Sequence, residues 1–289
     1  MGMRLVEYCT LVVFILCAHS QEIQNNAGEI WSECSLTCGS GLQYKLNDNQ
    51  ITRLCNTMEC PGDAGCLSAY LSFEHVNNKL IFDESKNGNL ATMLGTAQIV
   101  DKGKFGKALK LSDGGSVSFD VAKFKNRPSL AITIALWVKL EDIKGFQEIF
   151  FTCGKPHLYN VGAYHLGVND GTITWSLKDG DEKELFSLTS DKPMNTSQWY
   201  HIAGSYRLSN GEAKLYINGK MNKETKVEGK LKADDNWTCA DVGSSQDKKP
   251  VQGIIDEFYI FKCALLPQEI SELFSKNQFK KFLIPTPNH

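Results

Sequence analysis

Short runs of apolar and β-branched residues, separated by turn signals, make up most of the chain after residue 66. Residues 130–140 (LAITIALWVKL) are almost all bulky or β-branched, which predicts a central strand buried on both faces. Residues 212–217 alternate polar and apolar positions, as in a strand with one face in water. Asn210-Gly211 and Asn218-Gly219 favour tight hairpin turns on either side of it. This pattern predicts an antiparallel β-sandwich.

Other stretches extend the same pattern towards both ends of this region. We expect further strands at 67–74, 172–178, 199–206 and 252–262. Residues 267–274 are predicted to form a short amphipathic helix, because apolar positions recur at helical spacing and Pro267 stands at its start. The Trp199 and Tyr206 side chains are predicted to pack in the core.

The first twenty residues are typical of a secretory signal peptide. Arg4 precedes an apolar run at 9–18, and Ala18-His19-Ser20 offers small residues before a cut at Gln21. The run is shorter than the roughly twenty apolar residues of a membrane span. No second hydrophobic segment follows, so we expect a secreted protein with neither a membrane span nor a lipid anchor signal.

The net charge argues against one class of partner, and the cysteine content predicts disulfides. The net charge of −2 leaves no concentrated basic surface, which argues against nucleic-acid binding. Removing Cys9 and Cys17 with the signal peptide leaves eight of the ten cysteines, an even number that predicts disulfides in an exported chain.

After a polar leader at 21–30, a small module at 31–62 holds four of these cysteines. Too small to bury a sufficient core, it needs covalent links, and four cysteines allow three pairings. Zinc is the alternative, but the spacing is loose for a zinc ribbon and export favours disulfides. W-S-x-C-S-x-T-C-G-x-G (31–41) and R-x-C-N-T-x-x-C-P (53–61) resemble a thrombospondin type 1 repeat of about half the usual length. The resemblance implies the pairs Cys34–Cys55 and Cys38–Cys60, O-fucose on Thr37 and C-mannose on Trp31.

The long β-rich region, 66–276, resembles the laminin-G-like, concanavalin A-like jelly-roll superfamily, which includes the pentraxins; residues 277–289 form a tail. Seven landmarks occur in order: AYLSFE, FDESKNGN, KFGKALKL, ITIALWVK, WYHIA…LYINGK, IDEFYIF and ALLPQEI. The predicted fold is therefore all-β: an antiparallel concanavalin A-like jelly-roll sandwich with a small, disulfide-linked, thrombospondin type 1-like module before it.

Calcium is the cofactor that this resemblance implies. Family members often bind Ca²⁺ through a loop Asp and the Asp of the final strand, which correspond to Asp83 and Asp256. Asn87 and Asn89 add amide oxygens, a ligand type that a hard divalent cation prefers. We expect a structural calcium ion. The alternative is a solvated turn, with Asp256 accepting hydrogen bonds from backbone amides.

The scattered cysteines are expected to pair across the sandwich. First and last strands of such folds are neighbours, which would bring Cys66 to Cys263 and leave Cys153 for Cys239. The alternative is that Cys66 pairs within the small module. Asn195-Thr196-Ser197 and Asn236-Trp237-Thr238 are N-glycosylation sequons between predicted strands.

Catalysis has little support in the sequence. Some sandwiches of this class are glycosidases, which need two carboxylates facing one cleft, and the candidate pair is Glu182 and Glu184 in a charged hairpin. No serine-hydrolase, zinc-protease or phosphate-binding motif is present. We expect a non-catalytic adhesion or matrix protein that binds extracellular protein or glycan partners. Proteins of this make-up resemble matrix components, including those of invertebrate mineralised matrices. The alternatives are a calcium-dependent, pentraxin-like lectin of innate defence and a glycoside hydrolase.

Overall fold

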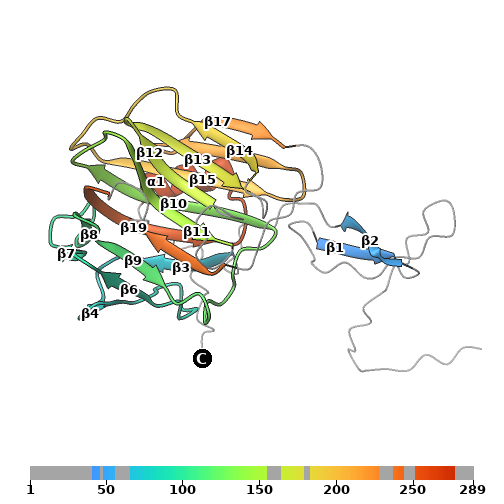
Figure 1. Ribbon diagram of the computed structural model, residues 1–289, viewed down its shortest axis with the longest axis horizontal. Coiled ribbons are helices and arrows are strands. Elements are labelled where there is room, and N and C mark those ends of the chain that lie inside the picture. Colours follow the sequence, from blue (N-terminus) through green and yellow to red (C-terminus); the bar gives the residue numbers. More distant parts are fainter. Residues whose placement is uncertain are drawn as a thin grey trace, which may run out of the picture.

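The computed structural model describes residues 41–45, 48–55, 66–154, 164–178, 183–227, 237–243 and 251–276. From residue 66 onwards they form two antiparallel β-sheets that pack face to face, with one short helix (Figure 1). The predicted all-β sandwich is confirmed.

The first sheet is centred on β10 and β19, the two longest strands among the described residues. Its strand order is β17-β16-β15-β10-β19-β8-β7, and β3 also pairs with β19. The bounds are β3 Leu67–Leu71, β7 Gln98–Val100, β8 Ala108–Leu111, β10 Ala131–Leu140, β15 Tyr200–Arg207, β16 Glu212–Ile217, β17 Lys220–Lys226 and β19 Gly253–Phe261.

The second sheet has the order β14-β13-β12-β11-β18-β9-β6-β5-β4. Its strands are β4 Val76–Asn77, β5 Leu80–Ile81, β6 Ala91–Leu94, β9 Ser116–Phe119, β11 Phe146–Cys153, β12 Tyr164–Asn169, β13 Thr172–Lys178, β14 Glu184–Thr189 and β18 Cys239–Val242. Most strands occur where the sequence predicts them. The strand expected at 67–74 is shorter, because Phe73 takes a φ of +66° that a regular strand does not accommodate.

The core lies between the sheets and continues onto the outer face of the first sheet. Leu136 of β10 belongs to the main core, together with Trp175 of the second sheet. Ala135, the preceding residue of β10, points the other way into a smaller cluster with Ile270 and Leu273 of helix α1 (Pro267–Lys276). β10 is therefore buried on both faces, as predicted, because the helix covers the side that the second sheet does not.

Helix α1 is capped at its start and packs on the first sheet near its end. At its start, Leu266 N donates to Glu269 Oε2 over 2.8 Å, one half of a capping box. Near its end, the Phe274 ring stacks on Trp137 at 5.4 Å between ring centroids. His201 lies edge-on to the same Trp137, and its burial lowers its pKa to about 3, so the imidazole stays neutral.

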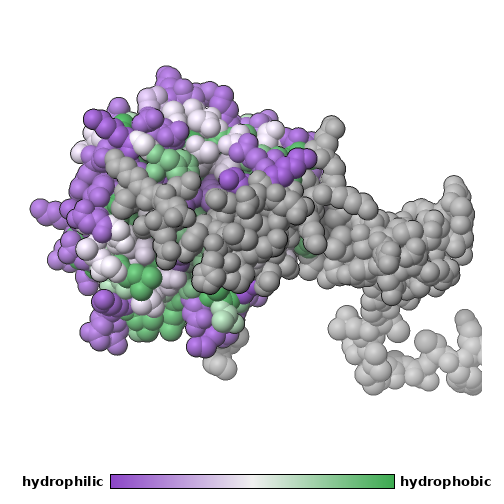
Figure 2. Space-filling view, in the orientation of Figure 1, coloured by the Kyte–Doolittle hydropathy of each residue, from purple (hydrophilic) through white to green (hydrophobic). Residues whose placement is uncertain are grey.

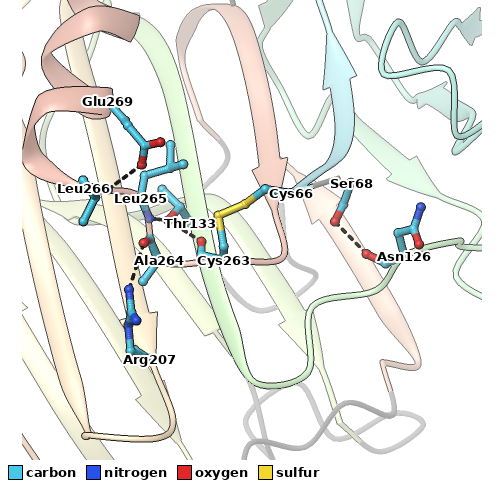
Figure 3. Close-up of a disulfide and its surroundings, with 10 residues drawn as sticks. All are labelled: Cys66, Ser68, Asn126, Thr133, Arg207, Cys263, Ala264, Leu265, Leu266 and Glu269. Atoms are coloured by element: carbon cyan, nitrogen blue, oxygen red, sulfur yellow. Dashed lines mark hydrogen bonds between the residues drawn. A yellow bond between two sulfur atoms is a disulfide. The ribbon is translucent and has the colours of Figure 1, made fainter. Parts of the chain in front are cut away.

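A disulfide closes the sandwich where its terminal strands meet. Cys66 precedes β3 and Cys263 follows β19, and their Cα atoms are 5.8 Å apart (Figure 3). Lys262 N donates to Cys66 O over 2.8 Å, which extends the pairing of the two strands. On the helix side, Thr133 Oγ1 donates to Cys263 O over 2.8 Å and accepts from Leu265 N over 2.9 Å. The bridge thus lies at the junction of β3, β10, β19 and α1.

The second disulfide joins neighbouring strands of the second sheet. Cys153 of β11 stands directly opposite Cys239 of β18, with 4.9 Å between Cα atoms. Both bridges are the pairings favoured from the sequence, and Cys66 does not pair within the small module.

Only the backbone of one hairpin is described in the predicted module at 31–62. It consists of β1 Gly41–Lys45 and β2 Asp48–Cys55. The predicted signal peptide, leader and tail lie outside the described residues, as do the side chains of Trp31, Cys34, Thr37, Cys38, Cys55 and Cys60. Within the described part of the chain, the helix is too short and too polar to cross a membrane.

Candidate functional site

A groove of about 860 Å³ lies at one end of the sandwich, where the two sheets and α1 meet. One wall is the loop after β14, residues 191–195, together with Tyr200 at the start of β15. The other wall is the turn from β16 into β17, with Phe274 of α1. Ile173 of β13 also lines it. The sequence predicted only the Asn195 sequon in this region and no ligand groove, because the lining comes from five separate segments.

Polar contacts join the two walls of the groove. Asp191 N donates to Asn222 Oδ1 over 3.3 Å, and the Asp191 carboxylate pairs with Lys223 Nζ at 2.5 Å. On the loop wall, Asn195 N donates to the Tyr200 hydroxyl over 3.0 Å. These bonds hold the 191–195 loop against the edge strand β17, so the groove is built by the fold.

The groove combines apolar surface with side chains that can bind hydroxyl or acidic groups. Tyr200 and Phe274 are partly exposed aromatic rings, and the Met221 side chain is 49% exposed. The one carboxylate of the lining, Asp191, is neutralised by Lys223. The ammonium groups of Lys192 and Lys220 have no ion pair among the described residues. The groove therefore carries a net positive charge. Hydrophilic side chains predominate along the edge where Figure 1 places β17 (Figure 2).

The predicted calcium loop is occupied by its own hydrogen bonds. Asp83 Oδ1 accepts from the backbone N–H groups of Tyr70 and Ser85, each at 2.9 Å, and Oδ2 accepts from Asn89 N at 2.8 Å. The Asn89 side chain donates to Ser68 O and Lys125 O, each at 2.9 Å.

Asn87 is held in the same way. Its Nδ2 donates to Leu67 O over 2.8 Å, and its Oδ1 accepts from Asn126 Nδ2 over 2.8 Å. The loop therefore ties β3 to residues 125–126 through three predicted ligands, Asp83, Asn87 and Asn89.

Asp256 belongs to a different set of contacts. Its Oδ2 accepts from Phe105 N and its Oδ1 from Glu257 N, each at 2.8 Å, and burial raises its pKa to about 7. It shares no hydrogen-bond partner with the Asp83 loop in the described residues. In the described part of the chain, His, Cys, Asp and Glu do not gather in threes around a point that could hold a metal. The described hydrogen bonds do not link Asp256 to Asp83, Asn87 or Asn89, and calcium binding by these four residues stays a prediction.

The neighbouring Glu257 is a buried acid that no sequence motif singled out. Tyr70 and Tyr259, whose rings stack at 4.3 Å, donate their hydroxyls to Glu257 Oε2 over 2.8 and 2.7 Å. Burial raises the pKa of Glu257 to about 7, and its φ of +52° is rare outside glycine. The Ile-Asp-Glu run was the only sequence signal, and it does not show that both acids are buried.

The model of the concanavalin A-like lectin/glucanases superfamily matches residues 111–271, which is more than half of the chain. The chain belongs to this superfamily. A comparison with curated proteins gave no match.

Solved structures of this superfamily's fold include sugar-binding and receptor-binding domains. Domain 4 of AbnA, a GH43 extracellular arabinanase from Geobacillus stearothermophilus solved with arabinotriose, is 25% identical, with a TM-score of 0.57 over 73% of this chain and 98% of that domain. The botulinum neurotoxin serotype D ligand-binding domain, solved with N-acetylneuraminic acid, is 17% identical, with a TM-score of 0.58.

The alignment with the botulinum neurotoxin serotype D domain covers 73% of this chain and 51% of that domain. The binding domain of Paraclostridial Mosquitocidal Protein 1 is 22% identical, with a TM-score of 0.58 over 74% of this chain and 53% of that domain. The chain thus spans about half the length of each toxin domain, and both of these similarities show the fold alone.

Glucanases of a concanavalin A-like fold need paired carboxylates, and the candidate pair is only half described. Glu184 is an exposed residue at the start of β14, opposite Lys178, and Glu182 lies outside the described residues. A different acid, Glu148 of β11, contacts His165 Nδ1 of β12, and both are buried, at 2% and 6% exposure. Sequence reasoning missed this pair because seventeen positions separate its members without any motif.

The first sequon is described in full, whereas the asparagine of the second is not. Asn195, Thr196 and Ser197 are all exposed in the loop that forms one wall of the groove. Asn236 lies outside the described residues, so its glycosylation stays a prediction.

Proposed function

We propose that this chain is a non-catalytic extracellular protein that binds glycans through the groove between the 191–195 loop and β17. The observation that carries the proposal is the groove itself. Its volume of about 860 Å³ lies within the range of about 300–1,000 Å³ typical of ligand sites. Superfamily membership supports it, as do similar domains solved with arabinotriose and N-acetylneuraminic acid.

The side chains of the groove suit a sugar with an acidic substituent. The apolar face of a sugar ring packs well on aromatic surface such as that of Tyr200, while its hydroxyls bind amide groups such as those of Asn195 and Asn222. Lys192 and Lys220 add positive charge that attracts a carboxylate or sulfate. A neutral sugar would leave these cations without a partner.

Lys220→Ala is expected to weaken binding about tenfold, the effect of losing roughly 1.4 kcal/mol of a charge-assisted contact. Lys226→Ala is the matched control, because Lys226 is an exposed lysine of the same strand that does not line the groove. The best ligand from a glycan array would be titrated calorimetrically into each variant. Equal loss in both variants, or an array without any bound glycan, would contradict the proposal.

Secretion and a role in adhesion or matrix assembly form the wider part of the proposal. The signal-peptide pattern, the two sandwich disulfides and the cysteine-rich stretch at 31–62 support an oxidising, extracellular setting. The resemblance of that stretch to a thrombospondin type 1 repeat supports a second binding module ahead of the sandwich. Thr37, Trp31 and Asn236 stay predicted modification sites of this module and of the sandwich.

The alternative functions make different predictions. A pentraxin-like lectin of innate defence would lose glycan binding in EDTA, whereas a matrix protein with a calcium-independent groove would keep it. A glycoside hydrolase would release sugar from its ligand and would be inactivated by Glu182→Gln and Glu184→Gln. No contact among the described residues favours the hydrolase over binding, since Glu184 is exposed at an edge strand.

Calcium stays a prediction of the family resemblance. Asp83 Oδ1 already accepts from two backbone N–H groups and Oδ2 from one, which leaves an acceptor position on Oδ2 for an ion. If a structural ion binds there, calcium at 100 times its dissociation constant adds about 2.7 kcal/mol to stability, which raises the unfolding temperature by several degrees. Asp83→Ala would abolish that rise. An unfolding temperature that is the same in calcium and in EDTA would reject the ion.

A further inference from the structure

The sequon Asn195-Thr196-Ser197 occupies a defined place in the groove wall. Asn195 follows the buried Met194, whose backbone N donates to Gly171 O over 2.7 Å, so the loop is anchored directly before the sequon. After it, Ser197 N donates to Leu140 O over 2.7 Å. The exposed sequon is therefore held between two backbone anchors, one on each sheet.

The Asn195 amide is free to be modified without loss of these anchors. Its backbone N donates to the Tyr200 hydroxyl, and its side-chain Nδ2 makes a 3.3 Å hydrogen bond to Gln198 Oε1. An N-linked sugar replaces one of the two Nδ2 hydrogens, so the remaining N–H can still donate to Gln198. The first sugar would then start at the groove wall in a restricted orientation.

We propose that Asn195 carries an N-linked glycan that covers this groove and shields it from external ligands. The inference rests on the proposed function, since the groove it covers is the proposed glycan site. In the modification, Nδ2 bonds to the anomeric carbon of a lipid-linked oligosaccharyl pyrophosphate. The bond from that carbon to the pyrophosphate oxygen breaks, the lipid pyrophosphate leaves with the electron pair, and Nδ2 gives up one proton.

Two features of the groove favour coverage by a covalently attached sugar. The attached glycan is held near the groove at high effective concentration, so even weak contacts with Tyr200 or Asn222 keep it there. The exposed Met221 on the opposite wall offers apolar surface for it to cover. An external glycan has to displace the attached one, which lowers the apparent affinity.

The test uses the full chain secreted from cells that perform N-glycosylation. Intact-mass analysis measures occupancy of Asn195, and the labelling rate of a Met221→Cys thiol by a maleimide measures access to the groove. Ser197→Ala removes the sequon but keeps the Asn195 side chain, and Asn195→Gln removes both. Asn236→Gln, which removes the other sequon, is the matched control.

We expect a glycan on Asn195, labelling of Met221→Cys at least fivefold faster in both sequon variants, and an unchanged rate in Asn236→Gln. An Asn195 without glycan, or equal labelling rates with and without it, overturns the inference. Array binding is read separately on the same proteins. Faster labelling without any bound glycan would support coverage of the groove while rejecting the proposed function.

Discussion

Replacing Cys66 and Cys263 together with serine is expected to lower the free energy of unfolding by about 5 kcal/mol. The bridge closes a loop of 197 residues, and loop-closure entropy of the unfolded chain predicts a value of this order. The affected strands are β3 and β19, which pair at the junction with α1. Urea unfolding, followed by tryptophan fluorescence, measures the loss.

The matched control is the double serine variant of Cys153 and Cys239. It removes the disulfide that closes a loop of 86 residues. The same model predicts a loss only about 0.7 kcal/mol smaller, because the entropy varies with the logarithm of loop length. A loss below about 1 kcal/mol for Cys66 and Cys263 would show that the pairing of β3 with β19 holds the termini without the bridge.

Gly204→Ala is expected to destabilise the protein by about 3 kcal/mol, although alanine normally suits a strand better than glycine. Gly204 lies in β15 with its open side towards the core, where an added Cβ would stand 2.4 Å from Trp175 Cδ2 and 2.8 Å from Cε2. The indole cannot move aside easily, because it is fully buried and its Nε1 donates to Ser205 O over 3.0 Å. Calorimetric or urea unfolding would measure the effect.

Two further variants test whether the clash with Trp175 is the cause. Gly114→Ala, where an added Cβ meets nothing within 4 Å but φ is +85°, should cost only about 1 kcal/mol of backbone strain. Trp175→Leu removes the ring, so adding Gly204→Ala to it should cost at least 1 kcal/mol less than in the wild type. Additive losses would mean that the glycine is needed for another reason.

Sequence alone determined the features that depend on neighbouring residues. The alternation at 212–217 marks β16, because a strand with one face in water has a period of two. The Asn-Gly turns mark the ends of its hairpins, and the continuous apolar run at 130–140 marks β10 as a strand buried on both faces. The Cys66–Cys263 bridge followed from one further step, the adjacency of terminal strands in folds of this kind.

Apart from the disulfides, tertiary structure decided the features that depend on residues distant in sequence. The four predicted calcium ligands are chemically suitable, yet Asp83 accepts from three backbone N–H groups and Asp256 contacts a different segment. The Glu148–His165 pair, the Trp175 ring beneath Gly204 and the groove wall at Asn195 leave no local pattern in the chain. Local periodicity records which face of a strand is buried, whereas the partner that a side chain meets is fixed only when the sheets pack.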